Sequence, residues 1–376
     1  MKRKKDRIVC LLIFSLILVL SSACMQEKST LSEAISTPDP KKELSITMLD
    51  VGQGLSLLLE SDGEYMLYDG GGREHSSTVV TYLKNMQIDS LTYLVASHYD
   101  EDHIAGLIGA MNTVDVSLAL TPDYETDTEI YQSFCRMVEG KHIKEEHPYP
   151  GQTYPLGYAD IQVMSPDAYD WENDNNNSIV MKVTMGEFSC LLCGDAEQEA
   201  EENMVAEMSS EEELKSNLLV VAHHGSSSST SQIFLDAVSP QYAWISVGEG
   251  NDYGHPTKTV LNRLKKAGVE LYRTDMQGDI TLTTDGKNIS LNKDSCDSWA
   301  SVTKVLPSDN KEEIVTEGSE NRMQDSTYIL NTKSHKFHKS SCSSISKMSA
   351  RNKKEVSADR EDLIAQGYEP CGNCKP

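Results

Sequence analysis

Short apolar runs rich in β-forming residues recur along the middle of the chain, and each is followed by polar side chains. Three of these runs, residues 91–97, 188–194 and 218–222, predict buried strands. Residues 257–267 instead carry apolar side chains at helical spacing, and Gly268 follows them as a typical helix end. Sites on open sheets usually lie at the carboxyl ends of strands, so the polar residues after the three runs are candidates for function.

The segment after the first run offers four metal-ligating side chains. His98, Asp100 and Asp102 occupy alternate positions and can converge, while His103 reaches the same cavity from another angle. A solvated acidic turn is the alternative interpretation. Two imidazoles that bracket two carboxylates directly after an apolar strand favour a metal site.

Three other segments end in side chains of the same kind. Asp195 follows the second run, His223 and His224 follow the third, and His255 lies in the turn that opens the predicted helix. Taken singly, each could be a structural histidine or a turn aspartate. Together with the first segment they predict one cluster, because a coincidence at all four places is improbable.

With further motifs in a fixed order, the chain resembles the metallo-β-lactamase superfamily and, within it, the competence-protein (ComEC) branch. The linked motifs are LDVGQG (49–54), YDGG (68–71), HYDEDH (98–103), NNNSIV (175–180), LCGD (192–195), AHHGS (222–226) and YGHP (253–256). The resemblance covers residues 44–292. It implies an αββα sandwich, which is an α/β fold, with a dinuclear metal site along the sheet edges and hydrolysis of phosphodiesters or related esters.

Two departures from the wider superfamily leave an oxygen-rich site. The superfamily usually has a second histidine where this chain has Asp100, and another histidine where this chain offers only residues 175–178. The competence-protein branch shares both, and oxygen ligands favour harder ions such as Mn²⁺ beside Zn²⁺. A third departure is local, because that branch commonly has an acidic residue where this chain has Leu55.

We therefore predict two divalent metal ions, Zn²⁺ or Mn²⁺, in this domain. Two cations bridged by a carboxylate lower the pKa of the water between them and hold the attacking and leaving oxygens of a phosphoryl group. Asp195 is the predicted bridge, Asp69 is predicted to orient a ligand histidine, and His255 is either a seventh ligand or a general acid. The predicted ligands are His98, Asp100, Asp102, His103, Asp195 and one of His223 and His224; the predicted catalytic residues are Asp102, Asp195 and His255.

Two flanking segments have simpler predictions. The serines at 226–229 could contact a phosphate oxygen, but a helix N-cap before residues 232–237 is the preferred interpretation. The glutamate-rich segment 197–213 predicts an exposed helix after Asp195.

The N-terminus has the pattern of a lipoprotein signal peptide over residues 1–24. The basic residues 2–5 precede the apolar run 8–20, which is short for a membrane span, and small residues then lead to Cys24. Lipidation of Cys24 would anchor the mature chain on the extracytoplasmic face of the membrane, with residues 25–43 as a polar tether. The alternative is an uncleaved anchor helix, which still places the enzyme outside the membrane.

Nine cysteines in a chain of this length do not indicate a disulfide framework. Cys190 and Cys193 are predicted to lie in the core on opposite faces of one strand, since side chains three apart on a strand point to opposite sides.

Near the C-terminus, His338 and Cys342 precede a Cys-x2-Cys pair formed by Cys371 and Cys374, a set that suits one structural zinc. The spacing resembles the metal-binding domain of the Ada DNA-repair protein over residues 327–376. Because His338 stands where that family has its methyl-accepting cysteine, methyl transfer is not implied. So small a segment is expected to need its metal to fold.

Charge separates the two modules. The whole chain carries a net charge of −24, whereas residues 328–376 hold nine Lys and Arg against five Asp and Glu. Such an acidic hydrolase is not built for tight non-specific DNA binding, which needs cations. Residues 293–326 are predicted to be an acidic linker. The sequence has no internal repeat and no transmembrane bundle, so we expect no membrane channel in this chain.

Three functions fit these patterns. The first is an extracytoplasmic metal-dependent phosphodiesterase or nuclease, with single-stranded DNA as one substrate. The second is a phosphorylcholine or teichoic-acid-type esterase with the same site. The third is a non-catalytic lipoprotein that binds nucleic acid or a partner, which the complete ligand runs disfavour. β-Lactam hydrolysis ranks below all three, because a histidine-rich first zinc site is missing.

Overall fold

The computed structural model describes residues 42–210 and 212–301. Of the C-terminal segment it describes 326–331, 336–339, 342, 344–345, 348, 352–358, 363, 368–371 and 374. The predicted signal peptide, Cys24 and nearly all of the tether lie outside these residues, as does 302–325 of the predicted linker. No helix among the described residues is long and apolar enough to cross a membrane.

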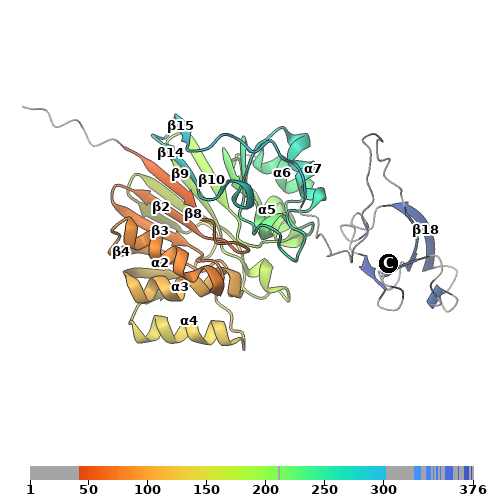
Figure 1. The fold of residues 1–376 in the computed structure, drawn as a ribbon, viewed down its shortest axis with the longest axis horizontal. Helices are drawn as coiled ribbons and strands as arrows, with labels where there is room; N and C mark the ends of the chain where they lie inside the picture. Colours follow the sequence, from red (N-terminus) through yellow and green to blue (C-terminus); the bar gives the residue numbers. More distant parts are fainter. Residues whose placement is uncertain are drawn as a thin grey trace, which may run out of the picture. The chain divides into compact units, whose positions relative to one another are not determined.

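The first sheet has eight strands in the order β15-β14-β1-β2-β3-β4-β5-β6 (Figure 1). β14, β1, β2 and β3 pair antiparallel, and β3 to β6 pair in parallel. The strands are β1 (Leu44–Met48), β2 (Leu57–Ser61), β3 (Glu64–Tyr68), β4 (Ser90–Val95), β5 (Asp115–Leu120), β6 (Lys144–Glu146), β14 (Ile280–Thr284) and β15 (Ile289–Leu291).

The second sheet has seven strands in the order β13-β12-β11-β10-β9-β8-β7. β10 to β13 pair in parallel, so their carboxyl ends lie at one edge. The strands are β7 (Thr153–Leu156), β8 (Ala159–Ser165), β9 (Val180–Met185), β10 (Phe188–Leu192), β11 (Leu218–Val220), β12 (Tyr242–Ile245) and β13 (Glu270–Arg273). The predicted strands at 91–97, 188–194 and 218–222 are thus confirmed as β4, β10 and β11.

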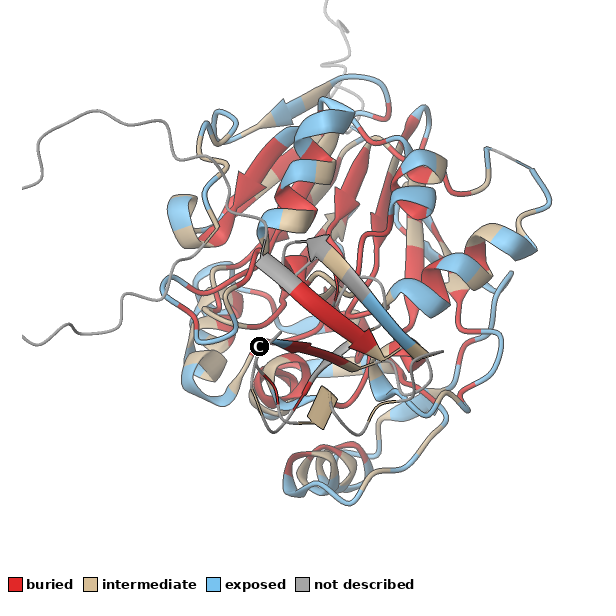
Figure 2. Ribbon diagram, turned by 90° about the vertical axis from the view of Figure 1, so that its right-hand side faces the viewer, coloured by how far each residue is buried: buried red, intermediate tan, exposed pale blue. Residues whose placement is uncertain are grey.

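Helices cover the outer face of each sheet, so the domain is the predicted αββα sandwich (Figure 1). Three buried clusters fill it: one between the sheets, one under the first helix layer and one under the second. In Figure 2 the strands are mostly buried beneath helices that expose their outer faces. The first layer is α2 (Ser76–Asn85), α3 (Glu101–Thr113) and α4 (Glu129–Gly140); the second is α5 (Gln198–Glu207), α6 (Gln232–Val238) and α7 (Lys258–Ala267).

Short helices complete the connections, and they are η1 (Arg73–His75), η2 (Asp174–Asn177), η3 (Ala222–Gly225) and α8 (Thr274–Gln277). The helix predicted at 257–267 is α7, and Gly268 ends it with a left-handed φ of 73°. Cys190 lies in the cluster between the sheets and Cys193 in the one under the second helix layer, which confirms that they face opposite sides.

Two predictions around α5 and α6 were wrong. Ser231, rather than the serines at 226–229, caps α6, since its side chain accepts a hydrogen bond from the Phe234 N–H. The segment after Asp195 is not uniformly exposed, because Glu201 is buried. Its carboxylate accepts hydrogen bonds from the backbone N–H groups of Thr230 (2.5 Å) and Ser231 (2.7 Å) and so fixes the start of α6.

The start of the predicted linker packs on the hydrolase domain. Buried Arg273 pairs with Asp275 and donates a hydrogen bond to the Ala300 carbonyl oxygen (2.6 Å). The Lys293 ammonium group donates to the Gln277 carbonyl oxygen (2.8 Å).

The C-terminal segment forms a separate sheet in the order β18-β16-β17-β19. Its strands are β16 (Ser326–Asn331), β17 (Lys336–Lys339), β18 (Lys353–Ala358) and β19 (Glu369–Pro370). Phe337, Leu330 and Leu363 form its small buried cluster.

Candidate metal centre

The turn between β4 and α3 places the first ligand-type side chains. β4 ends at Val95, Asp100 is the extended N-cap residue of α3, and Asp102 and His103 lie in the first helical turn. α3 packs tightly on the turn after β3, where a Cβ at Gly106 would overlap the Gly70 carbonyl oxygen. The close approach fixes the start of α3 beside that turn.

Two groups of side chains have ligand atoms within 4.8 Å of one another. The first is His98, His103 and Asp195; the second is Asp102, His103 and His224. The two oxygens of Asp195 face different histidines, with Oδ1 3.2 Å from His103 Nε2 and Oδ2 3.7 Å from His224 Nε2. The β4, β10 and β11 strand ends therefore meet in one cluster, as the sequence predicts.

Four ligand atoms in this cluster are buried without a hydrogen-bond partner. They are His98 Nε2, His103 Nε2, His224 Nε2 and Asp195 Oδ1. Buried polar atoms are costly unless something pairs with them, and these are the nitrogen and oxygen donors that divalent cations take. The residues therefore fit the metal ions that the sequence implies.

The other ring nitrogen of each buried histidine is held by a protein group. His103 Nδ1 donates to Asp69 Oδ2 (2.8 Å), and His224 Nδ1 donates to the Ser246 carbonyl oxygen (2.9 Å). The Ser97 hydroxyl donates to Asp69 (2.7 Å), which leaves its oxygen to accept from His98 Nδ1 (3.1 Å). These contacts direct each Nε2 lone pair into the cluster. Asp69 lies where the sequence predicts an orienting carboxylate.

The charges in the cluster stabilise one another. Burial alone would raise the pKa of Asp195, but the neighbouring His103 and His224 imidazoles outweigh it and hold that pKa well below its usual range. Burial likewise opposes the charged form of His103, yet Asp195 and Asp69 raise its pKa well above the usual value, so a metal ion would displace the Nε2 proton when it binds. The cluster therefore favours ionised carboxylates, the form that binds a cation.

The structure separates the two adjacent histidines. Both have a left-handed backbone, with φ of 50° at His223 and 53° at His224, so their side chains diverge. His224 is buried and its Nε2 lies 3.3 Å from Asp102 Oδ2. His223 is partly exposed, with Nδ1 3.0 Å from Glu197 Oε1 and Nε2 3.8 Å from Asp195 Oδ2. Sequence reasoning missed Glu197. Because Glu197 follows Asp195 by two residues beyond the same strand end, the sequence could have predicted that its carboxylate lies near the cluster.

The remaining candidates lie around the cluster. The Asp100 side chain is more than half exposed, with Oδ2 3.8 Å from His98 Nε2. His255 packs against His223 with ring centroids 5.6 Å apart, outside both ligand groups. Burial and the two neighbouring histidines lower the pKa of His255 to about 4, so it is neutral at pH 7. A neutral imidazole has no proton to give as an acid, so the predicted general acid role is not supported and the ligand role remains. Ser228 lies at the edge, where its hydroxyl is 3.4 Å from His223 Nδ1.

Comparison with known proteins settles the family. The profile described as the metallo-beta-lactamase superfamily matches residues 49–249, more than half of the chain. The chain belongs to the metallo-beta-lactamase superfamily. The fold of that superfamily binds divalent metals and implies a metal-dependent hydrolase or a related activity.

The relatives that this superfamily member matches fit the competence-protein branch that its sequence resembles. Competence protein ComA of Neisseria gonorrhoeae is 33% identical over 240 residues, 64% of this chain and 32% of the relative. ComE operon protein 3 of Bacillus subtilis is 26% identical over 261 residues, 65% and 33% of the two chains. The chain thus spans about a third of the length of these relatives. The metallo-beta-lactamase fold protein YhfI of Bacillus subtilis has 16% identity and a TM-score of 0.45, covering 65% of this chain and 100% of that one.

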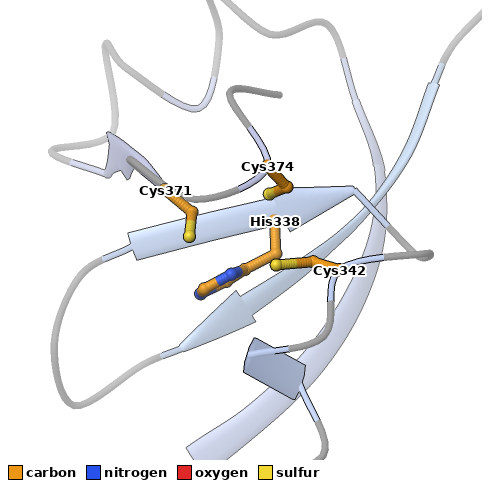
Figure 3. Close-up of side chains that lie close together, drawn as sticks. All are labelled: His338, Cys342, Cys371 and Cys374. Atoms are coloured by element: carbon orange, nitrogen blue, oxygen red, sulfur yellow. The ribbon is translucent and has the colours of Figure 1, made fainter.

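A second cluster lies in the C-terminal sheet. His338 on β17 and the three cysteines Cys342, Cys371 and Cys374 bring their ligand atoms within 4.8 Å of one another, and Figure 3 shows the four side chains converging. His338 Nδ1 is buried without a partner. The Cys371 N–H donates to the Phe337 carbonyl oxygen (3.0 Å) and the Cys342 N–H to that of Lys339 (2.9 Å), so β17 holds both ends of the cluster. The arrangement is compatible with a small zinc-binding domain.

Proposed function

We propose that the chain is a metal-dependent phosphodiesterase that cleaves single-stranded DNA. The observation that carries the proposal is the pair of His and Asp groups that share His103, with Asp195 directing one oxygen to each side. Two neighbouring cation sites suit the attacking and leaving oxygens of a phosphodiester. The relative named competence protein ComA supports DNA as the substrate.

The residues divide the work by position. Two divalent ions, Zn²⁺ or Mn²⁺, would supply an activated water and hold the phosphoryl oxygens when bound. We assign Asp102, His103 and His224 to one ion and His98 and Asp100 to the other, and the two oxygens of Asp195 would let it serve both. Asp69, Ser97 and the Ser246 carbonyl hold the histidine rings in place. We assign His255, which is neutral at pH 7, the role of an additional ligand.

The test is turnover by purified protein on a single-stranded oligonucleotide with Mn²⁺ or Zn²⁺ and after chelation. Asp102→Ala should abolish turnover, whereas Asp115→Ala, which removes an exposed carboxylate on β5, should not. Equal cleavage by the chelated protein, or by Asp102→Ala protein, would exclude the mechanism.

Two further substrates decide between the phosphodiester classes. Bis(p-nitrophenyl) phosphate reports hydrolysis of any phosphodiester, and a phosphocholine ester represents the esterase alternative. If the protein hydrolyses the phosphocholine ester but not DNA, the proposed nuclease is wrong and the protein is a phosphorylcholine or teichoic-acid-type esterase. Metal binding without turnover of any of the three would favour the non-catalytic binding protein.

We also propose that Cys24 carries a lipid anchor and that the enzyme works on the extracytoplasmic side of the membrane. The basic, apolar and small-residue pattern of residues 1–24 supports this. We further assign one structural Zn²⁺ to the four-residue C-terminal cluster, for which the geometry of His338 and the three cysteines is the support.

A further inference from the structure

A cavity of about 360 Å³ opens beside the metal centre. Asp102 belongs both to the second ligand group and to the cavity wall, so the cavity adjoins the metal centre. Arg73, Glu74, Glu101 and Tyr253 also line it. A volume of this size is within the range of small-molecule sites and leaves room for one substrate residue.

Tyr253 is an unusual component of this wall. Its side chain is 70% exposed, more than any other large apolar side chain among the described residues. Its ring stacks on the His255 imidazole, with centroids 5.8 Å apart and an angle of 24° between the planes. His255 covers one face of the Tyr253 ring, and most of the side chain is exposed. The ring therefore has exposed apolar surface on which a planar group could stack.

The loop that carries Tyr253 is held rigidly. The buried Asn251 side chain accepts from the Tyr253 and His255 N–H groups (3.2 and 3.1 Å) and donates to the His255 carbonyl oxygen (2.6 Å). The Gly248 N–H donates to Gln53 Oε1 (3.3 Å), which ties the loop to another residue of the cavity wall. A platform fixed before binding loses little conformational entropy when a ligand stacks on it.

We propose that Tyr253 stacks a nucleobase of the substrate and thereby makes the enzyme select nucleotide phosphodiesters. This rests on the proposed function, because the cavity matters only if the adjoining centre cleaves a phosphodiester. Base stacking on an aromatic ring needs no sequence-specific contact, which suits single-stranded DNA. Arg73 can pair with a flanking phosphate, since its exposed ion pair with Glu101 (3.3 Å) is weak.

The cavity favours a base over a quaternary ammonium group. Aromatic cages for such cations surround them with several rings, whereas Tyr253 is the one tyrosine, tryptophan or phenylalanine that lines this cavity. Glu74 and Glu101 would nevertheless attract a cation, so a choline ester belongs in the test.

The experiment compares kcat/KM of wild-type, Tyr253→Phe and Tyr253→Ala proteins on two substrates. One is a single-stranded oligothymidylate, and the other has the same backbone with abasic residues. The control is Tyr149→Ala, which removes an exposed ring that does not line the cavity. We expect Tyr253→Ala to lower the ratio of intact to abasic kcat/KM about 5- to 150-fold, as stacking of one base implies. Tyr253→Phe and the control should keep the wild-type ratio.

The outcomes separate the two proposals. If wild-type protein with Mn²⁺ or Zn²⁺ cleaves neither substrate, the proposed function fails. If it cleaves both with a ratio that Tyr253→Ala leaves unchanged, the enzyme is a nuclease and the stacking role is wrong. Loss of phosphocholine ester turnover in Tyr253→Ala, without a change in this ratio, would reassign the cavity to a quaternary ammonium group.

Discussion

Replacing Asp69 by asparagine should weaken the metal centre without removing a metal ligand. The buried Asp69 carboxylate accepts three hydrogen bonds, from the Ser97 N–H (2.8 Å), the Ser97 hydroxyl (2.7 Å) and His103 Nδ1 (2.8 Å). Asparagine has the same shape and tolerates the left-handed φ of 58° at this position. It has one acceptor oxygen, however, and its NH₂ group must face a donor.

The expected magnitude follows from these contacts. One buried donor left unpaired costs about 1–3 kcal/mol of the free energy of unfolding. Loss of a carboxylate that orients a ligand histidine typically lowers metal affinity about 10- to 100-fold. We therefore expect Asp69→Asn to lower both the free energy of unfolding and the metal affinity. Asp115→Asn should lower neither, because Asp115 is an exposed residue at the start of β5, away from the buried end of that strand.

Two assays measure these quantities separately. Urea unfolding of the chelated protein gives the free energy of unfolding, and calorimetric titration of Mn²⁺ or Zn²⁺ gives the affinity. If Asp69→Asn unfolds more easily but binds metal as tightly as wild type, Asp69 has only a structural role and the orienting role is refuted.

Four further predictions concern other parts of the chain. His224→Ala should lose about one bound metal ion by mass spectrometry, whereas His223→Ala should keep both; the reverse result would exchange their roles. Burial raises the pKa of Glu201 from 4.5 to about 7. The folded state then holds this proton more tightly than the unfolded chain, so the free energy of unfolding should fall by up to about 3 kcal/mol between pH 4.5 and 7. Glu201→Gln should remove this dependence in urea titrations, and an identical slope in both proteins would contradict it. Cys371→Ser should lower zinc content by one ion per full-length chain and leave phosphodiesterase activity intact; unchanged zinc would refute the C-terminal site. Cys24→Ala should block lipidation, so native membrane protein with an unmodified Cys24 would disprove the anchor.

Local patterns in the sequence were enough for much of the fold and of the ligand set. Apolar runs of strand length marked β4, β10 and β11, and the polar residues after each run converge at one cluster. β10 and β11 are parallel neighbours and bring their carboxyl ends to a common edge, whereas β4 belongs to the other sheet and reaches the cluster through the packing of the two sheets. The opposite burial of Cys190 and Cys193 follows from the two-residue period of a strand.

What the sequence left open depends on contacts between distant segments. Adjacent His223 and His224 are chemically alike, and only their left-handed backbone and the positions of Glu197 and Asp102 separate them. From the sequence, Glu201 is predicted to be exposed like the other glutamates of its helix. Its burial depends on the segment before α6, whose two N–H groups donate hydrogen bonds to its carboxylate. Periodicity along the chain reports which face of an element is buried, whereas the identity of the neighbour across that face is decided only when the layers pack.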